Sequence, residues 1–212
     1  MKILTLLIIF PIFSFSQVSE ELKVYVDSLS KVERYESMNI GYGGTYSKVY
    51  DLHIKASEIA TDEEIEYLSM NGTSIVKAYF SSEAIDRKLE SINKIFKHHL
   101  ANNEEFERID GCLGRKDDLV SLMYFEIINY KNQSWVLEAF GEKSKWTEKD
   151  ALKQLREFND IIKNSDYSTD KFLAYIIIYD EENLKKNCKN ILPMIQKDES
   201  DEQKYVMKIC KK

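Results

Sequence analysis

Apolar residues recur every three or four positions along most of the chain, which is the spacing of one face of an amphipathic helix. In residues 19–38, one such stripe is formed by Leu22, Tyr25, Val26, Leu29 and Val32. The same spacing predicts helical segments over 19–38, 45–60, 61–68, 74–89, 90–100, 117–130, 147–164, 168–179, 181–196 and 200–212. Residues 132–146 follow neither the helical spacing nor the alternation of a strand clearly. Over residues 168–179, a strand is the alternative to a helix.

Polar residues mark several of the helix starts. Thr61 and Glu64 have the spacing of a capping box, in which the hydroxyl accepts from the N3 amide and the carboxylate accepts from the cap amide. Thr147 is in position to cap the helix that follows it, and Asp117 or Asp118 is in position to cap the helix after them. These signals support the helical interpretation of the apolar pattern.

The fold class follows from this pattern and from the scarcity of residues that break helices. The chain contains two prolines and seven glycines. We therefore predict an all-α fold of seven to nine helices, mostly antiparallel hairpins stacked side by side in a HEAT-like, α-α superhelix arrangement. One helical domain is expected over residues 18–212, with a soft hinge near 141–145. The predicted core is Leu52, Ile65, Leu68, Val76, Tyr79, Ile95, Phe96, Leu122, Phe125, Leu155, Phe158, Phe172 and Ile176.

The first 17 residues have the layout of a signal peptide. Lys2 precedes an apolar run, Ile3 to Phe15, that is too short to span a bilayer of about 30 Å as a helix. The alternative is an uncleaved anchor, but nothing extends the apolar run, so cleavage is predicted near Ser16 or Gln17. The mature chain is then exported to the periplasm or the cell exterior, and it contains no further stretch that could cross a membrane.

The charge of the chain bears on its partners. The formal net charge is −6, and removal of residues 1–17, in which Lys2 is the one charged side chain, changes it to −7. Acidic and basic residues alternate finely, as expected for solvated helix surfaces. A nucleic-acid partner is disfavoured, because nucleic-acid binding requires a clustered basic face.

Three stretches within residues 40–130 carry a family resemblance: "IGYGGTYSKVYDLHIKAS", "ATDEEIEYLSMNGTSIVKAYF" and "IFKHHLANNEEFERIDGCLGRKDDLVSLMYF". They resemble an uncharacterised family of secreted Bacteroidetes proteins in which a HEAT-like helical hairpin is followed by a Gly-Cys segment. The chain departs from that pattern at Lys77, where an arginine is usual, and at Phe80, where a small residue is usual. The resemblance implies a helical-repeat fold and implies no activity.

Cys112 lies between Gly111 and Gly114, shortly after His98 and His99. A zinc site would need four ligands at workable spacing, but adjacent histidines on a helix point about 100° apart, and this cysteine has no Cys-x-x-Cys partner. A thiol nucleophile would need a histidine base and an orienting group. We favour a structural interpretation, in which the glycines and the cysteine form a helix-to-helix link with a packed thiol.

Cys188 and Cys210 fall on the apolar stripes of the last two predicted helices. A turn near residues 197–200 lies about equally far from both, so an antiparallel hairpin would bring the two thiols to similar heights. In an exported chain such a pair forms a disulfide if the Cα atoms come within about 7 Å. Pro193 could rotate Cys188 away from the turn, and two unpaired, packed cysteines are the alternative.

The function favoured by these observations is a non-enzymatic protein- or peptide-binding module of the cell envelope. An immunity or toxin-neutralising protein with an acidic face for a basic enzyme is the first alternative, and an enzyme of unknown type is the second. Neither a Gly-x-Ser-x-Gly nor a His-Glu-x-x-His motif occurs. We therefore expect no catalytic, cofactor-binding or metal-binding residue, no cofactor, and an unidentified protein or peptide as the partner.

Overall fold

The computed structural model of the chain describes residues 18–140, 144–165, 173, 177–178, 181–195 and 201–211. The predicted signal peptide lies outside the described residues, as do the predicted core residues Phe172 and Ile176. Most of the predicted hinge near 141–145 lies outside them as well.

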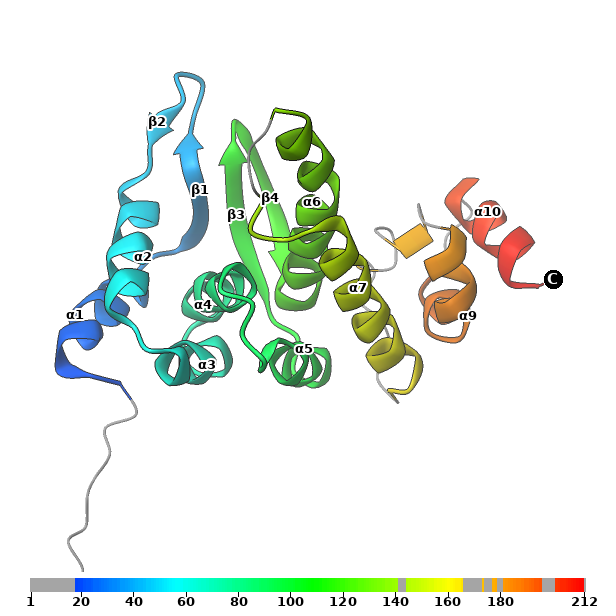
Figure 1. The fold of residues 1–212 in the computed structure, drawn as a ribbon, viewed down its shortest axis with the longest axis horizontal. Coiled ribbons are helices and arrows are strands. Elements are labelled where there is room, and N and C mark those ends of the chain that lie inside the picture. The colour runs from blue at the N-terminus through cyan, green and yellow to red at the C-terminus, as the bar shows by residue number, and fades with distance from the viewer. Residues whose placement is uncertain are drawn as a thin grey trace, which may run out of the picture.

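The described residues form nine helices and one four-stranded sheet (Figure 1). The helices are α1 (Glu20–Leu29), α2 (Lys48–Ile59), α3 (Asp62–Met70), α4 (Ser74–Asp86), α5 (Ile92–Ala101), α6 (Leu119–Ala139), α7 (Glu148–Lys163), α9 (Glu181–Ile195) and α10 (Asp201–Cys210). The strands are β1 (Arg34–Ile40), β2 (Thr45–Tyr46), β3 (Glu105–Gly111) and β4 (Leu113–Asp118). Figure 1 shows α1 and α2 toward one end of the molecule and the α9–α10 pair at the other.

The sheet has the strand order β2-β1-β3-β4 and is mixed, because β1 and β3 are parallel while the outer pairs are antiparallel. Tyr35 pairs with Arg108, and Arg108 pairs with Arg115, so the three side chains lie on one face of the sheet. This face is turned toward the helices. The Tyr35 ring stacks on Tyr79 of α4 at a centroid distance of 4.3 Å, and the Arg115 guanidinium lies 5.9 Å from the centre of the Phe125 ring of α6.

The prediction of an all-α fold of stacked HEAT-like hairpins is wrong. β1 occupies the end of the segment interpreted as a helix over 19–38, and β3 and β4 occupy the stretch interpreted as a link between helices. Strands are recognised by alternating apolar and polar residues. In β3 and β4, however, buried positions are filled by Arg108 and Asp117, which form an ion pair at 3.0 Å. In β3 buried side chains alternate with exposed ones up to Arg108, whereas in β4 the two buried residues, Asp117 and Asp118, are adjacent. Neither strand therefore shows an alternation of apolar and polar residues.

Gly111, Cys112 and Gly114 link two strands rather than two helices. Asp110 pairs with Leu113, which leaves Gly111 and Cys112 as a two-residue turn. Gly111 has a φ of +56°, a conformation that glycine adopts without the steric cost of a Cβ atom. The Cys112 side chain is exposed, so the prediction of a packed thiol is also wrong, because a hairpin turn at the end of a sheet has no element above it to pack against.

α4 is the central helix of the core. All of its residues from Ile75 to Ser81 are buried, and it packs against helices and against both central strands. Of the predicted core residues, Leu52 and Phe125 are partly buried. The predicted core residues that are buried are Ile65, Leu68, Val76, Tyr79, Ile95, Phe96, Leu122, Leu155 and Phe158.

The predicted helix starts agree with the structure. Thr61 and Glu64 form both hydrogen bonds of the capping box, and the Thr147 hydroxyl accepts from the amide of Asp150 at 3.1 Å. At α6 the cap is Asp118, whose carboxylate accepts from the Ser121 amide at 2.8 Å. α6 then runs through residues 132–139, the stretch with no clear period. No helix in the described part of the chain is both long and apolar enough to cross a membrane.

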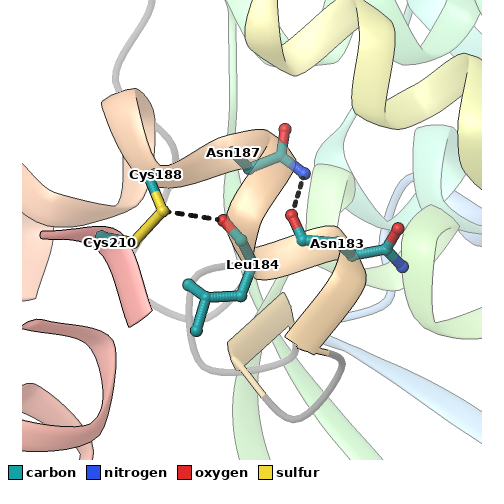
Figure 2. Close-up of a disulfide and its surroundings, with 5 residues drawn as sticks. All are labelled: Asn183, Leu184, Asn187, Cys188 and Cys210. Carbon is teal, nitrogen blue, oxygen red and sulfur yellow. Dashed lines mark hydrogen bonds between the residues drawn. A yellow bond between two sulfur atoms is a disulfide. The ribbon is translucent and has the colours of Figure 1, made fainter. Parts of the chain in front are cut away.

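Cys188 and Cys210 form a disulfide that joins α9 to α10 (Figure 2). Their Cα atoms lie 5.5 Å apart, although Pro193 is inside α9. The alternative of two unpaired cysteines therefore does not occur in the structure. The bridged sulfur of Cys188 lies 3.2 Å from the carbonyl oxygen of Leu184, which is a close contact, since a sulfur in a disulfide carries no proton to donate.

Buried asparagines connect α9 to α7. The Asn187 amide donates to the carbonyl oxygen of Asn183 at 2.8 Å, as Figure 2 shows, and to the side-chain oxygen of Asn159 on α7 at 2.7 Å. That same oxygen of Asn159 accepts from the Tyr124 hydroxyl of α6 at 3.0 Å. α9 is therefore held to the body of the molecule by polar contacts, whereas α10 packs mainly on α9 and is tied to it covalently.

We predict that Cys112→Ser changes the free energy of unfolding by less than about 0.5 kcal/mol, because an exposed side chain in a turn has few contacts to lose. Urea denaturation of the two proteins measures the difference. Native wild-type protein should also be alkylated at Cys112 within minutes. A loss of 2 kcal/mol or more, or a thiol that reacts only after unfolding, would show that the turn is packed against something.

We predict that the double variant Cys188→Ser/Cys210→Ser unfolds with a free energy about 3 kcal/mol lower than wild type, from the loop-closure entropy of a bridge between residues 22 positions apart. Hydrogen exchange should show loss of protection in α10 with little change in α4. Dithiothreitol should destabilise wild type and leave the double variant unchanged. Equal stability of the two proteins without reductant would contradict the prediction.

Candidate functional site

A cavity of about 410 Å³ opens between β1, α2, α4 and α6. Its volume is within the range of small-ligand sites, roughly 300–1,000 Å³. We call it the acidic pocket, because it contains several carboxyl groups. It is lined by Tyr35, Tyr50, His53, Ile54, Ser82, Glu83, Asp86, Glu126, Asn129, Tyr130, Gln133 and Lys145.

Helical spacing explains why these side chains converge. α4 contributes Ser82, Glu83 and Asp86, which are separated by one, three and four positions and follow the fully buried part of the helix. α6 contributes residues at 126, 129, 130 and 133, and α2 contributes residues at 50, 53 and 54, again at helical intervals. Each helix therefore directs one face of its surface into the same space.

Asp86 is shared between a phenol and an ammonium group. The Tyr130 hydroxyl donates to Oδ1 of Asp86 at 2.6 Å, and the Lys145 Nζ forms an ion pair with Oδ2. Burial, followed by the hydrogen bond to the carboxylate, raises the pKa of Tyr130 above its usual value. Tyr130 is therefore a hydrogen-bond donor at physiological pH, and each carboxylate oxygen of Asp86 has one partner.

Glu83 is held by a different cation. The Arg87 Nε donates to Oε1 of Glu83 at 2.7 Å, while the guanidinium also reaches Asp62 and the carbonyl oxygens of Ala60 and Ser57. Arg87 is thus fixed by several acceptors from the α2–α3 region. This ion pair lies at the C-terminal end of α4, and it gives Glu83 a compensating positive charge.

Among the described residues, Glu126 forms no ion pair. Its direct partner among the described residues is the Ser82 hydroxyl, which donates to Oε1 at 2.5 Å. Burial raises the pKa of the Glu126 carboxyl to about 7, and the carboxylates of Asp86 and Asp117 act in the same direction, while Ser82 and the Arg108 guanidinium oppose them. At neutral pH the pocket therefore contains a carboxyl group that is about half ionised.

His53 also lines the pocket and carries no charge at neutral pH. Burial lowers its pKa to about 4. Its ring stacks on Tyr79 at 4.7 Å, its Nδ1 lies 3.3 Å from the Ser57 hydroxyl, and its Nε2 lies 3.8 Å from Oε2 of Glu83. Serine, histidine and glutamate are thus adjacent, but Ser57 is buried and is not part of the pocket lining. The arrangement does not present a nucleophile to a substrate.

The described residues include no group of three or more His, Cys, Asp or Glu side chains with the geometry of a metal site. Lys145 already neutralises Asp86, and Arg87 neutralises Glu83. The pocket therefore offers hydrogen bonding, aromatic surface and negative charge to a ligand, rather than a cage of oxygen ligands.

The residues weighed from sequence as a metal or thiol site lie elsewhere. Cys112 is in the exposed β3–β4 turn. His99 is fully buried, with its Nε2 3.0 Å from the Ser81 hydroxyl and its pKa lowered to about 3 by burial. His98, the neighbouring residue, is only partly buried and does not line the acidic pocket. The structure therefore does not bring Cys112 and the two histidines together as a site.

Sequence reasoning missed the residues of the acidic pocket. His53 lies on an apolar stripe, which is typical of a core residue. Glu83, Asp86 and Glu126 have the sequence pattern of ordinary charged residues on helix surfaces. One signal was present. Glu126 follows an unbroken apolar run from Leu122 to Phe125, and a carboxyl group beside such a run is more often buried than one among other charges.

Comparison of the chain with protein-family models, with curated protein sequences and with solved structures finds no match. The function is therefore argued from the geometry of the acidic pocket alone.

Proposed function

We propose that the protein is a non-enzymatic binding protein, exported from the cell, whose acidic pocket takes a cationic, amine-bearing group of a peptide or small molecule. The observation that carries this proposal is Glu126, a carboxyl group in the pocket whose direct partner among the described residues is a neutral hydroxyl. An ammonium group of a ligand would give Glu126 the directly paired cation that it lacks among the described residues.

Tyrosine rings add to the attraction for a cation. Tyr50 and Tyr130 line the pocket near the carboxyl groups, and the face of an aromatic ring attracts a cation by about 0.5–2 kcal/mol. The same molecule uses this interaction elsewhere, since Lys88 Nζ lies 5.0 Å from the centre of the Trp146 ring. The net charge of −6 further favours the approach of cationic ligands.

A glycan hydrolase is the second candidate, and Glu126 is the observation that favours it. Glycosidases pair a carboxyl group of raised pKa, which acts as the acid, with an ionised carboxylate. Glu126 has a pKa of about 7 and shares the pocket with Glu83 and Asp86. Those two carboxylates are, however, already engaged by Arg87 and by Lys145, so they are poorly placed to act as a free nucleophile or base. Glycan turnover that Glu126→Gln abolishes would favour the enzyme over the binding protein.

Binding of an amine should depend on pH through Glu126. The probe is Nα-acetyl-lysine methylamide, with the neutral Nα-acetyl-norleucine methylamide as its control, followed by NMR chemical-shift titration. We expect saturable binding of the lysine derivative only, with an affinity that rises about tenfold from pH 6 to pH 8, because the carboxyl group ionises around pH 7 while the ligand stays charged. Four neighbouring groups shift the pKa of Glu126: Asp86 and Asp117 raise it, and Ser82 and Arg108 lower it.

Two variants test the assignment of that pH dependence. Glu126→Gln should weaken binding at pH 8 and make it independent of pH between 6 and 8. The matched control, Glu107→Gln, removes an exposed carboxylate of β3 that does not line the pocket and should leave the pH dependence unchanged. No binding of the lysine derivative to wild type at pH 8 would refute the proposed function.

We also predict that Glu126→Gln stabilises the protein above pH 7 by about 1–3 kcal/mol. The folded pKa of Glu126 is raised to about 7 from 4.5. The folded state therefore holds a proton that the unfolded state releases, and wild type loses stability as pH rises from 4.5 to 7. The gain from glutamine should be near zero at pH 4 and constant above pH 7.

The contrasting variant is Glu83→Gln, which should destabilise the protein at pH 8 because it removes the partner of Arg87. Chemical denaturation at several pH values measures both effects. A Glu126→Gln variant that is less stable than wild type at pH 8 would show that the carboxylate is compensated in the folded protein.

A further inference from the structure

We infer that Lys145 is an internal stand-in for the ligand: its ammonium group occupies the Asp86 end of the acidic pocket and is displaced when a ligand amine binds between Asp86 and Glu126, the two carboxyl groups that would then share it. This inference rests on the proposed function and adds to it the chemical class of the ligand, a primary ammonium group on a flexible chain such as a lysine side chain or a diamine.

The backbone at Lys145 is fixed by its neighbour. The indole Nε1 of Trp146 donates to the carbonyl oxygen of Ile85 on α4 at 2.9 Å, and the indole ring stacks on Tyr130 at 5.9 Å. Trp146 is 3% exposed. The next residue, Thr147, caps α7. The Lys145 side chain therefore extends from a fixed backbone position beside Asp86 and Tyr130.

The Lys145 side chain itself is held weakly. It is 65% exposed and pairs with Asp86, whereas the Arg87 side chain is 28% exposed and binds several acceptors. An exposed ion pair contributes little net free energy, because the charges are solvated and a long side chain loses conformational freedom. A ligand ammonium can thus replace that of Lys145 at low cost, and Lys145 can move into solvent.

The two oxygens of Asp86 define which cation fits. Oδ1 already accepts from the Tyr130 hydroxyl, and Oδ2 is the atom that Lys145 contacts. Once Lys145 leaves, Oδ2 is the oxygen without a partner among the described residues, and a group that needs both oxygens must share Oδ1 with Tyr130. A single acceptor suits an ammonium group, which is a point charge, whereas a guanidinium binds best to both oxygens of a carboxylate at once. The pocket should therefore prefer a lysine-type amine to an arginine side chain.

Lys145→Met tests the inference, because methionine keeps an unbranched side chain and removes the charge. We expect it to bind Nα-acetyl-lysine methylamide at least threefold more tightly than wild type, and to retain the preference over Nα-acetyl-arginine methylamide. The matched control is Lys153→Met, which removes an exposed lysine that pairs with Glu157 outside the pocket and should leave the affinity unchanged.

A second measurement reads the displacement directly. Brief acetylation followed by mass spectrometry should show that saturating lysine derivative increases modification of Lys145 in wild type and leaves that of Lys153 unchanged. If wild type binds the ligand but Lys145→Met binds equally or more weakly, the inference is overturned while the proposed function stands. Unchanged labelling of Lys145 at saturation would overturn it in the same way. If neither protein binds the lysine derivative, both the inference and the proposed function fail.

Discussion

The hydroxyl of Tyr79 joins α4 to β1, and the acidic pocket depends on this contact. It accepts from the Glu36 amide at 2.9 Å and donates to the Glu36 carbonyl oxygen at 2.8 Å. These hydrogen bonds are adjacent to the irregularity in the β1–β3 ladder, where the register shifts between Glu36 and Ile40. A side chain from the buried helix thus satisfies backbone groups that a regular ladder would otherwise satisfy, and it fixes the distance between the sheet and α4.

The ring of Tyr79 extends this connection to a third element. Tyr35 of β1 stacks on it at 4.3 Å and His53 of α2 at 4.7 Å, so one aromatic column ties β1, α4 and α2 together. His53 stays uncharged within that column because burial lowers its pKa to about 4. This side of the pocket therefore contributes no positive charge. The ammonium group of Lys145 pairs with Asp86, so the direct partner of Glu126 among the described residues is the neutral Ser82 hydroxyl. A carboxyl group held in this way lowers the stability of the fold when it ionises.

The sequence predicts the helical part of the fold well and the sheet not at all. Thr61, Thr147 and Asp118 mark helix starts through local hydrogen bonds that depend on a few neighbouring residues, so spacing alone identifies them. β3 and β4 are stabilised instead by pairing between distant strands and by the buried pair of Arg108 with Asp117, neither of which leaves an apolar alternation.

The acidic pocket could not be predicted for a related reason. Glu83, Asp86 and Glu126 have helical neighbours like those of any solvated carboxylate, and only the packing of α4 against α6 brings them into one cavity. The disulfide is the opposite case. Cys188 and Cys210 lie on two helices that follow each other in the chain, so their approach could be argued from the turn between them.

The parallel pairing of β1 with β3 has a consequence for how the protein acquires its structure. Arg34 lies opposite Glu107, and the chain between them forms α2 to α5. The joining of β1 to β3 is therefore later than the pairing of β3 with β4, since β1 and β3 can meet only after a long segment has been synthesised and its loop entropy overcome, and folding through such non-local contacts is slow.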